Sequence, residues 1–188
     1  MTMHSDTTTV TIARLFALSR DLLLEAVSDL SDEQWFHQPI EGVECIAWLV
    51  GHMMLVDRSV LEQFQSLALL PIALSLLPSP EWEMRFGTSS EQPYLIASYD
   101  ASEILDTFAE HRQLVLATLA VCDDTSLDRP LDAAAYKHLQ RDDDMPFFDY
   151  RTIGEMLIDM GSYIYSMLGE LSAIRQAMGL SEINIPGV

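Results

Sequence analysis

Apolar residues recur at intervals of three and four along four long stretches of this chain, and this spacing restricts its fold more than any other feature. The stretches cover about residues 8–30, 43–69, 100–122 and 152–178. Such spacing places apolar side chains on one face of an α-helix. No strand-like alternation of useful length occurs. The pattern therefore predicts an all-α protein, and four long amphipathic helices favour a four-helix bundle.

Helix-start signals and prolines divide the chain in a consistent way. Thr152 with Glu155, and Ser31 with Gln34, have the spacing of a capping box, and Asp100 is a good cap for the third long helix. The Ser31 box predicts a short helical turn before the second long helix. Two long connections, residues 70–99 and 123–150, contain several prolines, and the first has room for one more helical turn. We expect a single domain over residues 1–188.

The charge balance restricts the partners. Ten Lys plus Arg oppose 29 Asp plus Glu, which gives a net charge of −19, and Lys137 is the only lysine. A nucleic acid or an anionic membrane surface would need a basic face, so both are excluded as main partners. Cys45 and Cys122 lie far apart in apolar helical patterns and predict buried, reduced thiols, which together with the lack of a signal sequence favours a cytoplasmic protein.

The helices also carry a family resemblance. After LSDEQWFHQPIEG the second long helix reads CIAWLVGHMMLVDRSVL, and the fourth reads TIGEMLIDMGSYIYSMLGELSAIRQAMGL. PEWEMRFG and SYDASEILDTFAEHR lie between them. This order resembles the DinB-like superfamily of helical bundles regarded as metalloenzymes, which includes bacterial thiol S-transferases and a mycothiol-dependent maleylpyruvate isomerase. The resemblance covers about residues 10–180 and implies an up-down-down-up bundle with long crossover connections.

The resemblance implies a divalent metal, such as zinc or nickel, held by three histidines. The WLVGH motif places one of them at His52. The other two form an H-x-x-x-H pair on the fourth helix, and the Gly169-Glu170 step places that pair at Tyr163 and Met167. A phenol and a thioether are poor ligands for these metals. Metal affinity should therefore be lost or greatly weakened, and we expect no cofactor.

Other residues offer alternatives around this position. Asp159 lies one turn before Tyr163 and could form a metal site with His52 and another group, or could pair with the His52 imidazole. His52 is either a metal ligand or a buried histidine hydrogen-bonded to Tyr163 or Asp159. His111 is a second candidate ligand, against the simpler interpretation of a partly buried histidine bonded to a neighbouring carbonyl. Apart from His52, His111 and Tyr163 we expect apolar inner faces, with the acids in the solvated surface.

Two functional hypotheses follow. In the first, the chain is a degenerate, metal-poor or metal-free member whose pocket of His52, Tyr163, Met167 and Asp159 binds a small molecule, or whose surface binds a protein. In the second, a metal at His52 lowers the pKa of a thiol for transfer, as in a metal-dependent thiol S-transferase or a hydrolase-like enzyme. The resemblance and the apolar segment 67–77 also suggest a homodimer or a buried crossover.

Overall fold

The computed structural model describes residues 8–69, 80–87, 100–132 and 151–183. Over these ranges the chain forms helices and no strand, which confirms the all-α class. The long helices are α1 (Thr8–Val27), α3 (Ile46–Ser66), α5 (Ala101–Leu119) and α7 (Ile153–Ala177). The short ones are α2 (Asp32–Phe36), α4 (Pro80–Phe86) and α6 (Asp124–Leu127).

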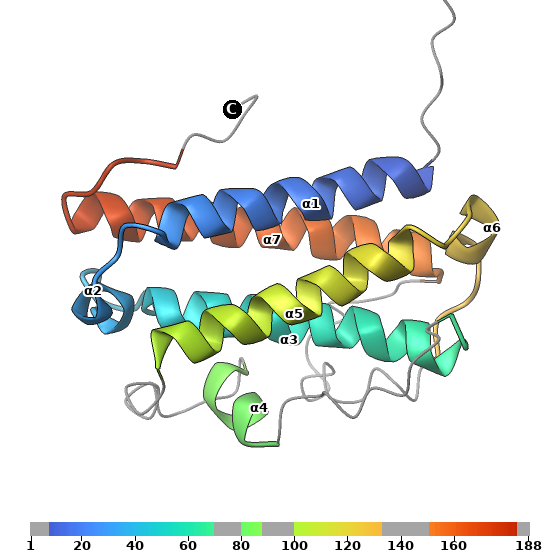
Figure 1. Ribbon diagram of the computed structural model, residues 1–188, viewed down its shortest axis with the longest axis horizontal. Coiled ribbons are helices and arrows are strands. Elements are labelled where there is room, and N and C mark those ends of the chain that lie inside the picture. Colours follow the sequence, from blue (N-terminus) through green and yellow to red (C-terminus); the bar gives the residue numbers. More distant parts are fainter. Residues whose placement is uncertain (1–7, 70–79, 88–99, 133–150, 184–188) are drawn as a thin grey trace, which may run out of the picture.

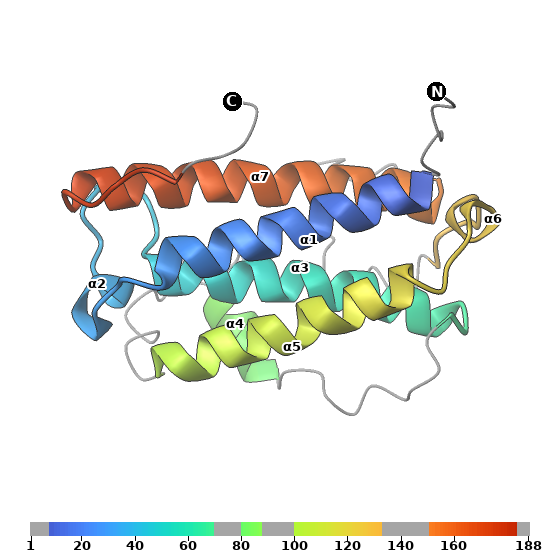
Figure 2. The same cartoon turned by 45° about the horizontal axis from the view of Figure 1, so that its top comes forward.

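The four long helices lie along one another with their apolar faces inward. Figures 1 and 2 show α1 beside α7 and α3 beside α5, and the contacts between these pairs agree. In Figure 1, α1 and α7 run in one direction while α3 and α5 run in the other, which is the up-down-down-up order. Short α4 packs on α3 on the side away from α1 and α7.

The predicted caps begin the helices where expected. Ser31 accepts from the Gln34 backbone N–H, and the Gln34 side chain accepts from the Ser31 N–H, so both halves of that capping box are present. Thr152 caps α7, although the Glu155 carboxylate accepts from the Arg151 N–H rather than from the cap residue itself. These contacts satisfy N–H groups that a helix start leaves without an internal partner.

Two elements differ from the sequence prediction. Helix α1 ends at Val27 instead of Leu30, because the next residues form tighter bonds to carbonyls three positions back. The second connection contains α6, which is too short to show an apolar period. The Asp124 side chain of α6 accepts from the N–H and hydroxyl of Thr9, so this turn also fixes the start of α1.

Some sequence predictions fall outside the described residues. These are the course of the apolar segment beyond Leu69, most of the first connection, and the second connection from residue 133 to 150. Within the described ranges, no helix combines the length and apolarity needed to cross a membrane.

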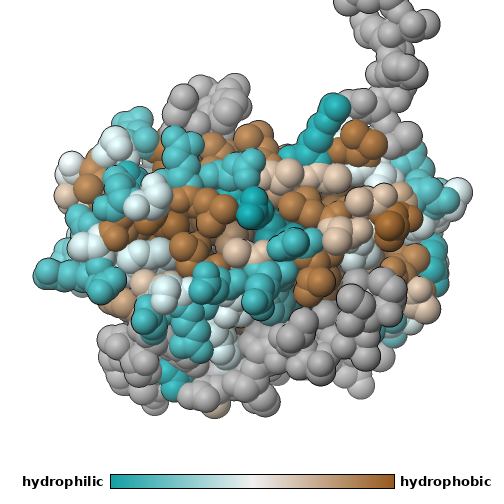
Figure 3. Space-filling view, viewed as in Figure 1, coloured by the Kyte–Doolittle hydropathy of each residue, from teal (hydrophilic) through white to brown (hydrophobic). Residues whose placement is uncertain are grey.

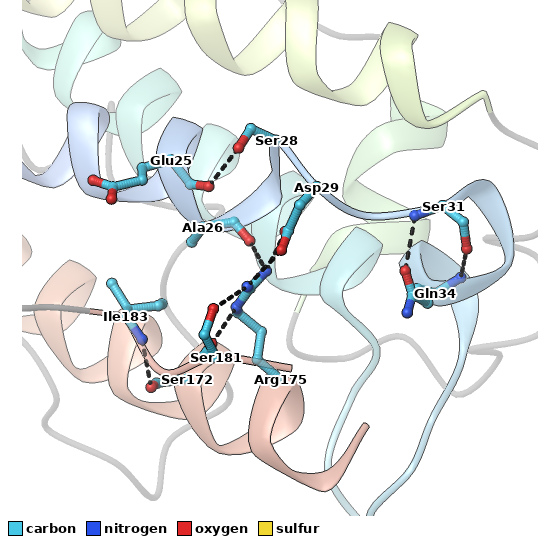
Figure 4. Close-up of polar contacts among 10 residues, drawn as sticks. All are labelled: Glu25, Ala26, Ser28, Asp29, Ser31, Gln34, Ser172, Arg175, Ser181 and Ile183. Atoms are coloured by element: carbon cyan, nitrogen blue, oxygen red, sulfur yellow. Dashed lines mark hydrogen bonds and ion pairs between the residues drawn. The ribbon is translucent and has the colours of Figure 1, made fainter. Parts of the chain in front are cut away.

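Arg175 joins the far ends of α1 and α7 (Figure 4). Its guanidinium donates to both carboxylate oxygens of Asp29, at 2.7 and 3.0 Å, and to the carbonyl of Ala26. Its Nε donates to the Ser181 carbonyl, just after α7 ends. The hydrogen bond and charge of Arg175 lower the pKa of Asp29. A bidentate pair of this kind fixes the direction in which the chain leaves α1 and leaves α7.

A buried ion pair joins α3 to α5, and it corrects the expectation that the acids lie in the solvated surface. Arg112 Nε donates to Asp57 Oδ2 at 2.7 Å, and both side chains are fully buried. Arg112 Nη1 donates to the Phe16 carbonyl at 3.0 Å and to Ser19 Oγ at 2.6 Å, both on α1. Burial raises the pKa of the Asp57 carboxyl, against the charge of Arg112. One guanidinium therefore connects three of the four long helices.

The exposed surface is mixed. Figure 3 shows apolar residues interspersed with polar ones over the face that α1 and α5 present. On α1 and α7, the large aliphatic residues most exposed to solvent are Val10, Leu18 and Ile158. Scattered apolar residues are normal for a protein surface, so the homodimer suggested by the sequence stays a prediction.

Gly51 allows α4 to dock on α3. A Cβ atom added at Gly51 would lie 2.3 Å from the Phe86 ring, far inside van der Waals contact. Phe86 is fully buried and lies 5.0 Å from the ring of Trp82, so α4 presents two aromatic side chains to the bundle. The absence of a side chain at Gly51 creates the space for Phe86.

We predict that Gly51→Ala destabilises the protein by about 1–3 kcal/mol through overpacking against Phe86. Gly169→Ala on α7 is the matched control, because a Cβ there would meet nothing within 4 Å. That control should be neutral or stabilising by up to about 1 kcal/mol, since alanine favours a helix. Urea unfolding measures both. Equal stabilisation by the two substitutions would show that Phe86 does not pack on Gly51.

Candidate functional site

His52 lies on α3 between α4 and α7, and only 8% of its surface is exposed. Its Nδ1 is 2.6 Å from the Phe86 carbonyl oxygen on α4, and its Nε2 is 3.1 Å from the Tyr163 hydroxyl on α7. The Trp48 ring stacks on the imidazole, with centroids 4.6 Å apart and an interplanar angle of 8°. We refer to Trp48, His52, Phe86 and Tyr163 as the His52 cluster.

The partners of the imidazole determine where its proton lies. A carbonyl oxygen can only accept, so Nδ1 of His52 carries the hydrogen and donates to Phe86. In the neutral ring Nε2 is then an acceptor, and the Tyr163 O–H donates to it. Burial lowers the pKa of His52, which favours this neutral form, although the Phe86 hydrogen bond opposes the shift. Both nitrogens of His52 are therefore engaged.

Tyr163 is more exposed than the sequence predicted. We expected it on the inner face of the fourth helix, but 40% of its surface is exposed while its hydroxyl reaches the buried imidazole. Burial and the negative charge of Glu170 raise the pKa of Tyr163. The phenol thus keeps its proton near neutral pH and acts as the donor. The hydrogen bond predicted between His52 and Tyr163 is confirmed.

The other candidate residues on α7 lie on either side of Tyr163. Met167 is one turn further along and is 2% exposed, whereas Asp159 is one turn earlier and is exposed. The partner that the structure gives His52 on α7 is Tyr163, the first of the two that the sequence suggested. A shared pocket of these four residues stays a prediction.

The remaining candidates are His111 on α5 and the two cysteines. His111 Nδ1 donates to the Thr107 carbonyl at 2.8 Å within α5, which confirms the simpler interpretation of that residue. Cys45 is buried at the start of α3, Cys122 is half-buried, and both are free thiols. Burial raises the pKa of each thiol, so neither is activated as a nucleophile.

Comparison with known proteins identifies the family. Residues 15–158, more than half of the chain, match the family described as the DinB superfamily. The chain belongs to the DinB superfamily. The matched region includes His52 and ends five residues before Tyr163. No curated protein and no solved structure gives a significant match.

The metal implied by membership of the DinB superfamily does not fit the residues present. Among the described residues, no group of three His, Cys, Asp or Glu side chains could hold a metal ion. The Nε2 lone pair of His52 accepts a hydrogen bond from Tyr163. The Tyr163 phenol would have to lose its proton in order to coordinate a metal, and its raised pKa opposes that loss. Met167 offers a neutral thioether, a weak ligand for zinc or nickel. The donor set is that of a hydrogen-bonded histidine.

Sequence reasoning missed two members of the His52 cluster. Trp48 precedes His52 by four residues on α3, so the i, i+4 spacing could have indicated the ring stack. Phe86 contributes a backbone carbonyl, which leaves no signal in a sequence, and it lies in the first long connection. That carbonyl nevertheless sets the tautomer of His52.

We predict that His52 makes the stability of the protein fall as the pH drops below about 6.5. Its folded-state pKa lies below its ordinary value of 6.5, so the unfolded chain takes up a proton first as the pH falls. This contribution to stability is present above pH 6.5 and is lost below it, with a slope of at most about 1.4 kcal/mol per pH unit. Urea unfolding at several pH values should show a shallower slope for His52→Gln. Identical slopes would show that the pKa of His52 does not change on folding.

Proposed function

We propose that this chain is a metal-free, ligand-binding member of the DinB superfamily, and that the His52 cluster is its binding site. One observation carries the proposal: the Tyr163 hydroxyl occupies the Nε2 lone pair that a metal would need. With tyrosine at position 163, His52 is half of a hydrogen-bonded pair instead of a metal ligand. Tyr163 is the partly exposed half of that pair, so it can meet a ligand from solvent.

The groups around Tyr163 indicate which ligands would bind. Trp48 and Tyr163 supply aromatic surface, and the partly exposed Tyr163 carries a hydroxyl. Asp159 and Glu170 lie on the same helix as Tyr163, and the charge of Glu170 acts on its hydroxyl. A negatively charged ligand would be repelled. The site therefore suits an uncharged or cationic small molecule with a flat or apolar part and a hydrogen-bond acceptor.

The alternative is a metal-dependent thiol transferase that uses His52. That activity needs an open metal site, which normally keeps three protein ligands. Tyr163 and Met167 supply neither imidazole nor carboxylate at the two remaining positions. Metal content separates the two functions directly.

We predict that purified, untagged protein contains no stoichiometric transition metal, whereas Tyr163→His combined with Met167→His binds zinc or nickel tightly. Two added imidazoles at i and i+4 would face His52 and restore the family's three ligands. Elemental analysis and zinc titration measure the gain. Adding His52→Ala to the double variant is the control and should remove it. Stoichiometric metal in the parent that is lost in His52→Ala would contradict the proposal.

We also predict that neutral or cationic aromatic compounds raise the melting temperature, while carboxylates of similar size do not. For a compound that binds, Tyr163→Phe should weaken affinity roughly five- to tenfold, the value of about one hydrogen bond. Tyr165→Phe is the matched control, because that hydroxyl is directed to the Leu15 carbonyl on α1. Equal affinity in both variants would place the ligand elsewhere. If no compound acts, a protein-binding role is favoured instead.

A further inference from the structure

Four buried side-chain polar atoms have no hydrogen-bond partner in the part of the chain that the structure describes, and three of them belong to residues on α3 and α5 at the buried ion pair. These three are Asp57 Oδ1, His111 Nε2 and Arg112 Nη2. The three residues are at most 2% exposed. Buried polar atoms are normally paired, so three of them on an ion pair and the residue next to it in sequence need an explanation.

These residues meet where α3 packs on α5. Arg112 Nε lies 2.7 Å from Asp57 Oδ2, and His111 precedes Arg112 on α5. The His111 imidazole is close enough to Asp57 for its charge to act on the carboxyl. The rings of Phe16 and Phe108 lie 5.0 and 5.1 Å from the guanidinium carbon and shield it from solvent. The ion pair is therefore closed to large ligands.

The Asp57–Arg112 ion pair leaves one polar atom of each residue without a hydrogen-bond partner. A guanidinium can bind both oxygens of a carboxylate, but only the Nε to Oδ2 contact is within hydrogen-bond distance here. Arg112 Nη1 is committed to the Phe16 carbonyl and to Ser19. Arg112 Nη2, with its two N–H groups, and Asp57 Oδ1 are left without a partner, and His111 Nε2 is the third such atom.

The hydrogen-bonding capacity of the three atoms identifies the ligand. His111 Nδ1 donates to the Thr107 carbonyl, so Nε2 is an acceptor in the neutral ring and a donor in the protonated one. In either state the set contains at least one donor and at least one acceptor. Chloride could only accept and would be repelled by Asp57, whereas a cation would be repelled by Arg112. A water molecule, with two donors and two acceptors, matches both states.

We propose that one ordered water is bound between α3 and α5, accepting from Arg112 Nη2 and donating to Asp57 Oδ1 and His111 Nε2. Buried waters typically make about three hydrogen bonds of this kind and form part of the structure. The water extends the ion pair to His111. It thereby gives that histidine a role in the core beyond its bond to Thr107.

A crystal structure of the wild-type protein, at a resolution that places ordered waters, tests the proposal. We expect a single peak roughly 2.6–3.2 Å from all three atoms. An empty site with Asp57 turned so that Oδ1 bonds Arg112 Nη2 directly would overturn it. A peak that contacts only one of the three atoms would also overturn it.

A variant provides a second test in solution. Asp57→Leu combined with Arg112→Met removes two of the three water ligands, and apolar replacement of a whole buried pair is normally tolerated. NMR cross-peaks between His111 and a long-lived water should be present in the wild type and lost in this variant. Glu62→Leu with Arg58→Met is the matched control, since that ion pair lies elsewhere on α3, and it should keep them. Cross-peaks that persist in the first variant would contradict the proposal. If that variant does not fold, the wild-type crystal structure decides alone.

Discussion

The Arg112 guanidinium is the point on which the packing of the long helices depends. It is fully buried, binds Asp57 on α3 and two groups on α1, and lies over two phenylalanine rings. Breaking such a pair by removing one partner typically costs about 3–5 kcal/mol, because the other charge stays buried and unpaired. An apolar core could hold these helices at many relative rotations. A charge that must find its partners allows far fewer, so the pair acts on specificity as much as on stability.

A comparable constraint operates at His52. His52 Nδ1–H donates to the Phe86 carbonyl, and Nε2 accepts from the Tyr163 hydroxyl. Both ring nitrogens are therefore hydrogen-bonded without a metal. Stacking on Trp48 fixes the plane of the ring. The histidine that the family resemblance singled out is thus present, but the residue opposite it determines its chemistry. A motif match at one position says little when its partner position has changed.

The apolar period and the caps predicted the four long helices to within a few residues, since both depend on neighbours in the sequence. The pairing of His52 with Tyr163 was also predictable, because a buried imidazole needs partners and the family register faces the two together. The Asp57–Arg112 pair was not, since its members lie 55 residues apart and charged side chains on helices usually face solvent. Helix α6 was missed because four residues cannot show a helical period.

Phe86 connects two parts of the molecule that the sequence keeps apart. Its ring fills the space above Gly51, and its carbonyl holds the next residue on α3, His52. The docking of α4 and the position of the imidazole are therefore thermodynamically linked. A molecule that displaced the Tyr163 hydroxyl from His52 would also change the hydrogen bond that holds α4, and by reciprocity a change in α4 would alter the affinity for that molecule. The position of α4 would then depend on whether a ligand is bound at α7, through the hydrogen bonds that His52 on α3 makes to both helices.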